Sequence, residues 1–366
     1  IVYFYYRVGF SSILEATIMA SDAVQLPDAP GIHGLRFRHF RAGDDFNHMA
    51  SITRTSAEVD DTERADTPEQ IAKFYEHLTN SDPYTDMIFA EVDAGDGREL
   101  EVIGYSRGAW RVEASGEYWY MFFGRLLPRW RRKGIGSAML RWIEGRLRVI
   151  AAGHPTEVEK FFLSFAAQCE TGLAAMLEKT GYQPARHWFE MVRPDLEHIP
   201  NFPLPEGLEM RPVLPEHYQA IWNADNEAFR DHWGFMEPSE QDYQAWLVDK
   251  TSFQPELWQV AWDMATNQVA GQVRTFIDHE QNKLYHRLRG WTEGISVRRP
   301  FRRRGLARAL IAHSLRVQKQ AGMTESALGV DSENLSGATK IYEDCGFRVV
   351  KTETIYRKPL ITTGQK

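Results

Sequence analysis

The sequence predicts a mixed α/β fold that occurs twice along the chain. Three observations support this prediction: the length of 366 residues, a proline-rich stretch near the middle, and the same order of apolar segments on either side of it. The hydrophobic fraction of 43% is sufficient for packed cores and argues against disorder. Each half shows alternating apolar segments first and a strand–helix–strand pattern later, which is typical of a sheet with antiparallel and parallel strands. We therefore expect two domains of similar size.

Charge and cysteine content exclude several classes of protein. The formal net charge of −7 gives no general attraction for nucleic acid or for anionic membranes. No apolar run has the length of about 18 residues that a membrane-spanning helix needs. The two cysteines, Cys169 and Cys345, form no disulfide framework and lack the spacing of metal ligands. We therefore expect a cytoplasmic protein without a metal site.

The first 30 residues are expected to lie outside the fold. Their first two-thirds are aromatic and partly apolar, but Arg7 and Glu15 interrupt the apolar run, so it is not a typical signal peptide. We interpret residues 1–30 as a leader or extension, with Met19 as a possible start of the protein.

A linker is predicted near the middle of the chain, between Arg193 and Leu208. Prolines crowd this short polar stretch, and because they lack an N–H donor and favour extended neighbours, they are typical of a linker; they are Pro194, Pro200, Pro203 and Pro205. The linker separates a predicted first domain, residues 31–198, from a predicted second domain, residues 199–366. We refer to these two ranges as the first half and the second half.

The first half begins with strands and continues with a helical pattern. Apolar runs predict strands at 35–40, 87–92, 102–107 and 117–123, with a helical region at 48–58. After a basic turn, apolar residues recur every four positions, which predicts a helix with one buried face: Ile135, Met139, Ile143 and Leu147. A strand at 161–165, a helix near 173–177 and a turn at Thr180-Gly181 complete this half.

The second half repeats this order. Strands are predicted at 208–213, 258–262, 269–276 and 291–297, with a helix at 218–229 and a hairpin turn at Asn267. After a second basic turn, we expect a helix at 306–320, a strand at 326–330, a helix at 336–344, a turn at Cys345-Gly346 and a strand at 347–356. The matching order indicates a duplication.

The basic turn of each half is suited to binding an anion. Each turn lies between an apolar strand and an amphipathic helix, where unpaired backbone N–H groups and the helix dipole favour negative charge. Gly305 allows a ligand to approach the backbone closely, and the arginines offer forked donors to phosphate oxygens. Neither turn fits a Walker A loop or a dinucleotide-binding G-x-G-x-x-G turn. A solvated basic turn is the simpler alternative for either one alone.

These turns resemble a known cofactor loop. Arg302-x-x-Gly305-x-Ala307 and Arg131-x-x-Gly134-x-Gly136 look like the Q/R-x-x-G-x-G/A loop by which GNAT-type N-acetyltransferases bind the pyrophosphate of acyl-CoA. The second half adds Asn334-Leu-Ser-Gly-Ala338 and Ile341-Tyr342-Glu-x-x-Gly346-Phe347, which are similar to the late motif of that family. Together these motifs cover most of residues 208–358, and two such halves resemble the tandem architecture that includes mycothiol synthase.

The resemblance implies that acetyl-CoA, or another short acyl-CoA, binds between two parallel strands that splay apart. Ile295 and Val297 would contact the pantetheine arm through their backbone, and Asn334 would help to place the cofactor. The pyrophosphate would lie on the second turn, which consists of Arg302, Arg303, Arg304, Gly305, Leu306 and Ala307. The matching cofactor-binding residues of the first half would be Arg131, Arg132, Gly134 and Gly136.

Glu293 and Tyr342 are the candidate catalytic residues. An amine must lose a proton before it attacks a thioester, and Glu293 could accept that proton through a water molecule. Tyr342 could protonate the leaving thiolate, and a strand N–H, that of Ile295 or Val297, could hold the oxyanion. The simpler alternatives are an exposed strand residue for Glu293 and a core ring for Tyr342.

The two halves differ at the positions that carry chemistry. With the halves aligned on their turn glycines, Phe122 stands where the second half has Glu293. With the late glycines aligned, Leu177 and Cys169 stand where the second half has Tyr342 and Asn334. We therefore expect the second half to be catalytic and the first half to be degenerate.

The acceptor side is expected in the segment after the first helix of the second half. Asp231, His232, Trp233 and Phe235 combine a carboxylate with aromatic walls, which suits a cationic amine. The alternative is that the aromatic residues form the core of a helical hairpin. No residue there identifies the substrate.

The expected function is transfer of an acetyl group from acetyl-CoA to a primary amine by direct attack. A small-molecule amine is the expected acceptor, and a protein lysine is also compatible with these residues. The alternative from another class is a non-catalytic acyl-CoA sensor. A nucleic-acid binder that uses the cluster from Arg298 to Arg308 is a third, weaker alternative.

Overall fold

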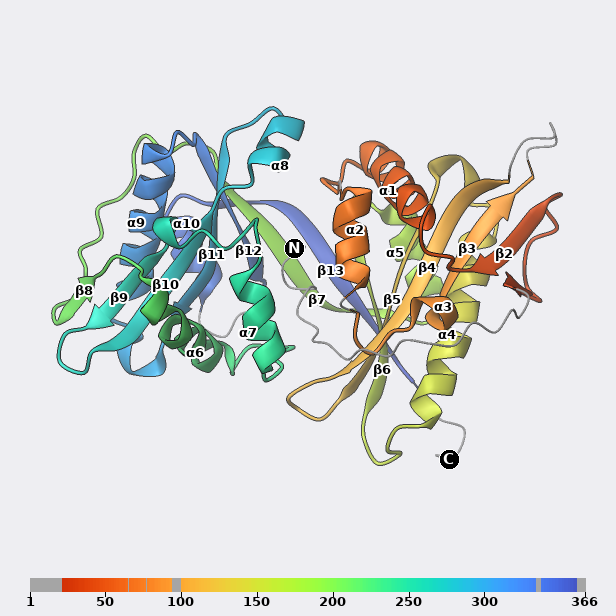
Figure 1. The fold of residues 1–366 in the computed structure, drawn as a ribbon, viewed down its shortest axis with the longest axis horizontal. Coiled ribbons are helices and arrows are strands. Elements are labelled where there is room, and N and C mark those ends of the chain that lie inside the picture. The colour runs from red at the N-terminus through yellow and green to blue at the C-terminus, as the bar shows by residue number, and fades with distance from the viewer. Residues whose placement is uncertain (1–21, 65, 77, 94–99, 334–336, 361–366) are drawn as a thin grey trace. The chain divides into compact units, whose positions relative to one another are not determined.

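The computed structural model describes residues 22–64, 66–76, 78–93, 100–333 and 337–360. These residues form two compact units (Figure 1). The N-terminal unit contains described residues up to Ala185 and, from the end of the chain, those from Glu353 onward; the C-terminal unit contains Arg186 to Thr352. This division differs from the predicted border between residues 198 and 199, because two long strands each have residues in both units.

The N-terminal unit contains most of the elements of the first half. They are β1 (Ala23–Val24), β2 (Leu35–His39), α1 (Asp45–Asp60), α2 (Pro68–Tyr75), α3 (Pro83–Asp86), β3 (Met87–Val92), β4 (Glu101–Val112), β5 (Tyr118–Leu126), α4 (Ile135–Ala152), β6 (Lys160–Ala167) and α5 (Thr171–Lys179). Strands β1 to β5 pair antiparallel in chain order, and β5 then pairs parallel with β6. The other edge of β6 pairs with residues 353–359 of the last strand, β13 (Arg348–Pro359).

The C-terminal unit repeats this arrangement. Its elements are β8 (Leu208–Met210), α6 (Tyr218–Phe229), α7 (Glu240–Leu247), β9 (Gln259–Asp263), β10 (Gln268–Phe276), α8 (His279–Leu284), β11 (Arg289–Val297), α9 (Leu306–Gln320), β12 (Glu325–Asp331) and α10 (Ala338–Asp344). Strands β8 to β11 pair antiparallel, and β11 pairs parallel with β12. The other edge of β12 pairs with Trp188 to Arg193 of β7 (Gln183–Arg193). The predicted mixed sheet, formed twice, is confirmed.

The sheet of each unit is therefore completed by a strand segment that is distant in sequence from the other strands or follows the other half of the chain. The end of β7 follows the first half in sequence but completes the sheet of the C-terminal unit. The end of β13 follows the second half but completes the sheet of the N-terminal unit. Composition and periodicity identify strands but not their partners, so this exchange was not part of the prediction.

Helices cover both faces of each sheet because alternate strand residues point to opposite faces. In β3, Met87 and Phe89 lie in a core with residues of α1, whereas Ile88 and Ala90 lie in a core with residues of α4. In the C-terminal unit, Val260 packs with α6 and the next residue, Ala261, packs with α9. Figure 1 shows these helices beside their sheets.

The prediction that residues 1–30 lie outside the fold is wrong for residues 22–30. Ala23 and Val24 pair with β2, and Leu26 is 8% exposed in a core with Ile135. Apolar residues in this stretch thus cover the start of α4. Residues 1–21, including Met19, lie outside the described residues.

Candidate active site

Two parallel strands separate in the middle of the C-terminal unit. Strands β11 and β12 are paired from Arg289 opposite Glu325 to Trp291 opposite Ala327, and the recorded pairing ends there. Both strands continue beyond this point, β11 to Val297 and β12 to Asp331. Where strands separate, backbone groups lose their ladder partners, and a side chain or a ligand can bond to them instead.

Glu293 lies just beyond the point of separation and spans the gap. Its Oε1 accepts a hydrogen bond of 2.7 Å from the backbone N–H of Gly329 on β12. A bulge next to Glu293 shifts the register between β10 and β11, and Gly294 within it has φ 57°. A side chain at Gly294 would be strained at this positive φ and would displace the guanidinium group of Arg274, so the position favours glycine.

The surroundings of Glu293 favour its neutral form. Burial raises the pKa of this carboxyl group above its ordinary value, and the nearby charge of Glu190 adds to the increase. The hydrogen bond from Gly329 and the positive charge of Arg274, its cross-strand neighbour, oppose the increase. A carboxylate with a raised pKa is suited to accept a proton at neutral pH.

Tyr342 lies on α10 in the same environment as Glu293. It is 7% exposed and packs in the main core of the unit with Leu310 and Phe347. Burial, followed by the negative charge of Glu293, raises the pKa of its hydroxyl group, so the phenol stays protonated at neutral pH. Within the described part of the chain, no group hydrogen bonds to this hydroxyl, so its proton is available for donation.

The second basic turn leads directly into α9. Gly305 precedes the helix with φ 86°, and Arg303 also has a positive φ of 62°. No described side chain caps α9, and no described atom lies within 4 Å of the position that a Cβ of Gly305 would take. The first amide groups of a helix have no acceptor within the helix, so this turn is open to an anion. Leu306 is buried, and only its backbone can contribute.

Arg302 braces the turn from within the unit. Its Nε donates to the carbonyl oxygen of Val297 at 3.0 Å, and Nη2 donates to that of Ala228 at 3.0 Å. Its Nη1 lies 3.4 Å from the carboxylate of Asp231. The phosphate contact predicted for Arg302 therefore stays a prediction, because the guanidinium group already holds the strand and the helix together.

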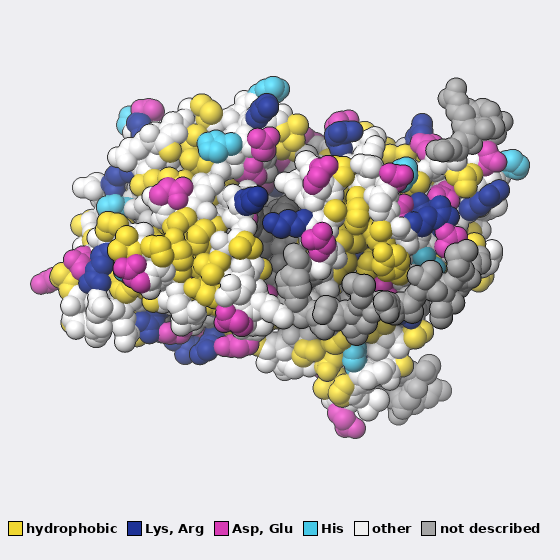
Figure 2. All heavy atoms as spheres, viewed as in Figure 1, with side chains coloured by type: hydrophobic (Ala, Val, Ile, Leu, Met, Phe, Trp, Pro, Cys, Tyr) yellow, Lys and Arg dark blue, Asp and Glu magenta, His cyan; other side chains and the backbone are white. Residues whose placement is uncertain are grey.

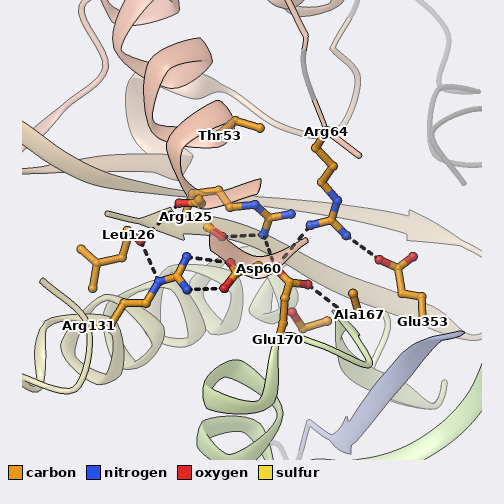
Figure 3. A network of polar contacts seen from close by, with 12 residues as sticks. Thr53, Asp60, Arg64, Arg125, Leu126, Arg131, Ala167, Glu170 and Glu353 are labelled. Carbon is orange, nitrogen blue, oxygen red and sulfur yellow. Dashed lines mark hydrogen bonds and ion pairs between the residues drawn. The ribbon is translucent and has the colours of Figure 1, made fainter. Parts of the chain in front are cut away.

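The corresponding arginine of the first half makes the matching contacts. Arg131 donates from Nε to the carbonyl oxygen of Leu126 and forms two hydrogen bonds, of 2.6 and 2.8 Å, with the carboxylate of Asp60 (Figure 3). Gly134 has φ 89°, and no described side chain caps α4. Unlike Gly305, however, Gly134 is covered: a Cβ there would lie 3.5 Å from Pro30.

Acidic partners neutralise arginines on both sides of the second basic turn, within the cluster from Arg298 to Arg308. Arg298 pairs with Glu227, Arg299 with Asp231 and Arg308 with Asp344. Figure 2 shows side chains of both charges interspersed over the face in view, without a continuous basic surface there. This arrangement gives little support to a nucleic-acid site at this turn.

The predicted acceptor residues lie in the segment between α6 and α7. Asp231 is paired with Arg299, which lowers the pKa of its carboxyl group, so this carboxylate already has partners in the protein. His232 packs against Phe229 with 4.4 Å between ring centroids, and burial lowers its pKa, so it is neutral at pH 7. The ring of Trp233 lies 4.9 Å from the guanidinium carbon of Arg186.

Of four further residues that were predicted to bind the acceptor or the cofactor, the structure describes three. Phe235 is half-buried, and its N–H donates to the carbonyl oxygen of His232. Ile295 and Val297 lie on β11 beyond the separation and pack against the main core. Asn334 lies outside the described residues.

In the N-terminal unit, the protein's own side chains join the corresponding strands. Ser164 stands at the position of Gly329, and its hydroxyl group donates to the carbonyl oxygen of Phe122, the counterpart of Glu293. Beyond the end of β6, Glu170 forms ion pairs with Arg125 at 3.7 Å and with Arg64 at 3.4 Å. Figure 3 shows Arg64 between Glu170 and Glu353. Leu177, at the position of Tyr342, is fully buried.

Sequence reasoning did not single out three residues in and around this region: Gly294, Arg274 and Arg186. A glycine within a strand pattern often marks a bulge, so Gly294 carried a usable signal. Arg274 and Arg186 carried none, because their importance depends on which strands are neighbours. Among the described residues, there is also no cluster of three or more side chains that could hold a metal ion, and no helix is long and apolar enough to cross a membrane.

The chain is also similar in sequence to known proteins. Residues 218–347 match the model of the Acetyltransferase (GNAT) family. The chain is 29% identical over 232 residues to the mycothiol acetyltransferases of Salinispora arenicola and Salinispora tropica, a match that covers 60% of this chain and 67% of each relative.

Similar folds occur among solved structures. A GCN5-related N-acetyltransferase from Sphaerobacter thermophilus has a TM-score of 0.67 and 24% identity, and the match covers 92% of this chain and 97% of that one. A tandem GNAT protein from the clavulanic acid biosynthesis pathway has a TM-score of 0.59 and 15% identity, with 90% and 99% covered.

Proposed function

We propose that the second half of this tandem GNAT-type N-acetyltransferase moves an acetyl group from acetyl-CoA to the primary amine of a small molecule. The observation that carries this proposal is the position of Glu293, which bonds across the separated strands beside the protonated phenol of Tyr342. The first half lacks both groups, so we assign the chemistry to the second half. The named activity of the relatives favours a small acceptor over a protein lysine.

The cofactor fits the turn and the separated strands. The uncapped start of α9 and the open space at Gly305 suit a pyrophosphate, which the helix dipole would also attract. Backbone groups of Ile295 and Val297 would hold the pantetheine arm where β11 leaves β12. The thioester supplies the activated acetyl group. Another short acyl-CoA would satisfy the same contacts.

Glu293 would act as the general base. It would take a proton from the ammonium group of the acceptor, directly or through a water molecule, and leave a neutral amine to attack the thioester carbon. A backbone N–H of β11, from Ile295 or Val297, would stabilise the charge that develops on the carbonyl oxygen.

Tyr342 would act as the general acid. As the bond between carbon and sulfur breaks, its hydroxyl would donate a proton to the thiolate, so that CoA leaves as a thiol. After its attack the nitrogen carries one proton too many, and it loses that proton, directly or through water, to leave the neutral amide. The deprotonated phenol regains a proton from solvent, and Glu293 releases the one it accepted. We also propose that the reaction takes place in the cytoplasm, since Cys169 and Cys345 are both free thiols.

An amine-library screen that follows release of the CoA thiol tests this proposal. We expect at least one small primary amine to release thiol from acetyl-CoA in proportion to acetylated product. A protein that binds acetyl-CoA but releases no thiol with any amine would instead be a sensor.

A further inference from the structure

Strand β7 forms one side of the C-terminal site, although it precedes the predicted linker. Its residues Arg186, Trp188 and Glu190 alternate along the strand and therefore share a face of the sheet. Trp188 is paired with Asp331 and Glu190 with Gly329, the residue that donates its N–H to Glu293. The family match begins at residue 218, so it does not include this strand.

Arg186 connects three separate segments of the unit. Its Nε lies 2.8 and 2.7 Å from the two carboxylate oxygens of Asp331, at the end of β12. Its Nη2 donates to the carbonyl oxygen of Glu333 at 3.4 Å. Its guanidinium carbon lies 4.9 Å from the ring centroid of Trp233, in the segment after α6. The side chain is 14% exposed, so water screens these contacts only weakly.

The segment from Asp231 to Trp233 is thereby held at both ends. Asp231 is anchored by Arg299 and Arg302 beside the basic turn. Trp233 is anchored by Arg186 on the other side. His232 lies between these two anchors and packs on Phe229.

We propose that Arg186 is a positioning residue for the amine acceptor, because it holds Trp233 and the segment 231–236 as a fixed wall of the acceptor site. This inference rests on the proposed function. A planar guanidinium can bond to a carboxylate edge-on while an aromatic ring covers its face, and an ammonium group cannot do both in the same way. Lysine at position 186 should therefore fail to replace arginine.

The test compares Arg186→Gln and Arg186→Lys with the parent and with a matched control. The control is Arg141→Gln, which removes an exposed ion pair with Asp28 in the N-terminal unit. In amide hydrogen exchange of the free full-length chain, both Arg186 variants should exchange faster at 231–236, while α9 and the control variant stay unchanged. In kinetics, KM for the best amine should rise at least about tenfold, with acetyl-CoA affinity within about twofold of the parent.

Each contrary result has a distinct meaning. Unchanged hydrogen exchange at 231–236 would show that Arg186 does not hold this segment. Faster exchange with an unchanged KM for the amine would show that the segment is not part of the acceptor site. If affinity for the amine, affinity for acetyl-CoA and melting temperature all fell together, Arg186 would serve the general stability of the protein instead. If the parent released no thiol with any amine, the proposed function would fail and the acceptor role with it, whereas the exchange result would still decide whether Arg186 holds Trp233.

Discussion

Glu293 depends on its neighbours for a proton affinity that suits catalysis. Burial raises the pKa of its carboxyl group, so the acidic limb of the kcat/KM profile should lie above the range of an ordinary glutamate. Glu293→Gln keeps the size of the side chain but cannot accept the proton. We expect the rate to fall roughly 10²–10⁴-fold and the acidic limb to disappear. An unchanged pH profile would remove Glu293 from the mechanism.

The stability of the same variant separates catalysis from structure. A group whose pKa is higher in the folded than in the unfolded state contributes stability that is lost as the pH rises through the folded pKa. Glu293→Gln has no such loss, so the variant should gain stability relative to the parent from acidic to neutral pH. A melting temperature below that of the parent at neutral pH would indicate that a charged acceptor for the Gly329 N–H contributes more to stability than desolvation of that charge costs.

Tyr342 should affect turnover and leave cofactor binding nearly unchanged. Its hydroxyl is needed when charge builds on sulfur, so the interaction is stronger in the transition state than in the ground state. Tyr342→Phe keeps the ring in its core position. We expect turnover to fall roughly 10²-fold or more and calorimetric acetyl-CoA affinity to stay within a few-fold of the parent. Equal losses in both would mean that the hydroxyl serves binding alone.

Single residues show what sequence can and cannot provide. Tyr342 was chosen from the late motif and Glu293 from its place on the strand before the turn, but the partner of Glu293 is a backbone N–H of Gly329, which no pattern marks. Likewise, the arginines of the turns were expected to bind a phosphate, and no pattern showed that Arg131 and Arg302 also brace their own turns through Asp60 and Asp231. An acidic residue that is distant in sequence can form an ion pair with an arginine, and no pattern around the arginine indicates it.

At the scale of elements, the glycine turn before each long helix offers a matched pair of variants. Gly305→Glu places a carboxylate in the open space where an anion would bind, and it should abolish transfer. Gly134→Glu carries the same charge and the same cost, about 1–2 kcal/mol, of a left-handed backbone at a residue with a side chain. If only the second half is catalytic, Gly134→Glu should keep most of its turnover.

Activity and circular dichroism of both variants, measured side by side, test this assignment. Loss of activity in a folded Gly134→Glu protein, together with full activity in Gly305→Glu, would reverse the roles of the two halves.

Several elements were predicted because their apolar periodicity is strong. The helix expected at 306–320 is α9 with the same ends, and the strand expected at 87–92 is β3. Helices α2, α7 and α8 were missed, since they are short and contribute few buried side chains. Strand β7 was also missed, because its first residues are exposed and proline follows it directly.

At the scale of the whole molecule, the exchanged strands determine where the chain can be divided. The fragment 186–352 contains every described strand residue that pairs within the C-terminal unit. The fragment 199–366 lacks β7, including Met191, and it also lacks Leu196; both of these residues are buried in the main core. It retains instead the end of β13, whose partner β6 it does not contain.

We therefore expect 186–352 to fold and 199–366 to remain unfolded or to aggregate. Removing Met191 and Leu196 sacrifices about 1.5–3 kcal/mol of apolar burial for each, against a typical total stability of roughly 5–15 kcal/mol. The bare edge of β12 and the unpaired end of β13 would also expose backbone groups that favour association.

Thermal unfolding and size-exclusion chromatography of both fragments would test this expectation, with the full chain as a reference. A cooperative transition and a monomeric profile for 199–366, without either for 186–352, would show that the linker rather than the strand pairing sets the border. Because the proposed catalytic residues Glu293 and Tyr342 lie in both fragments, folding and not the chemical groups should decide which fragment binds acetyl-CoA.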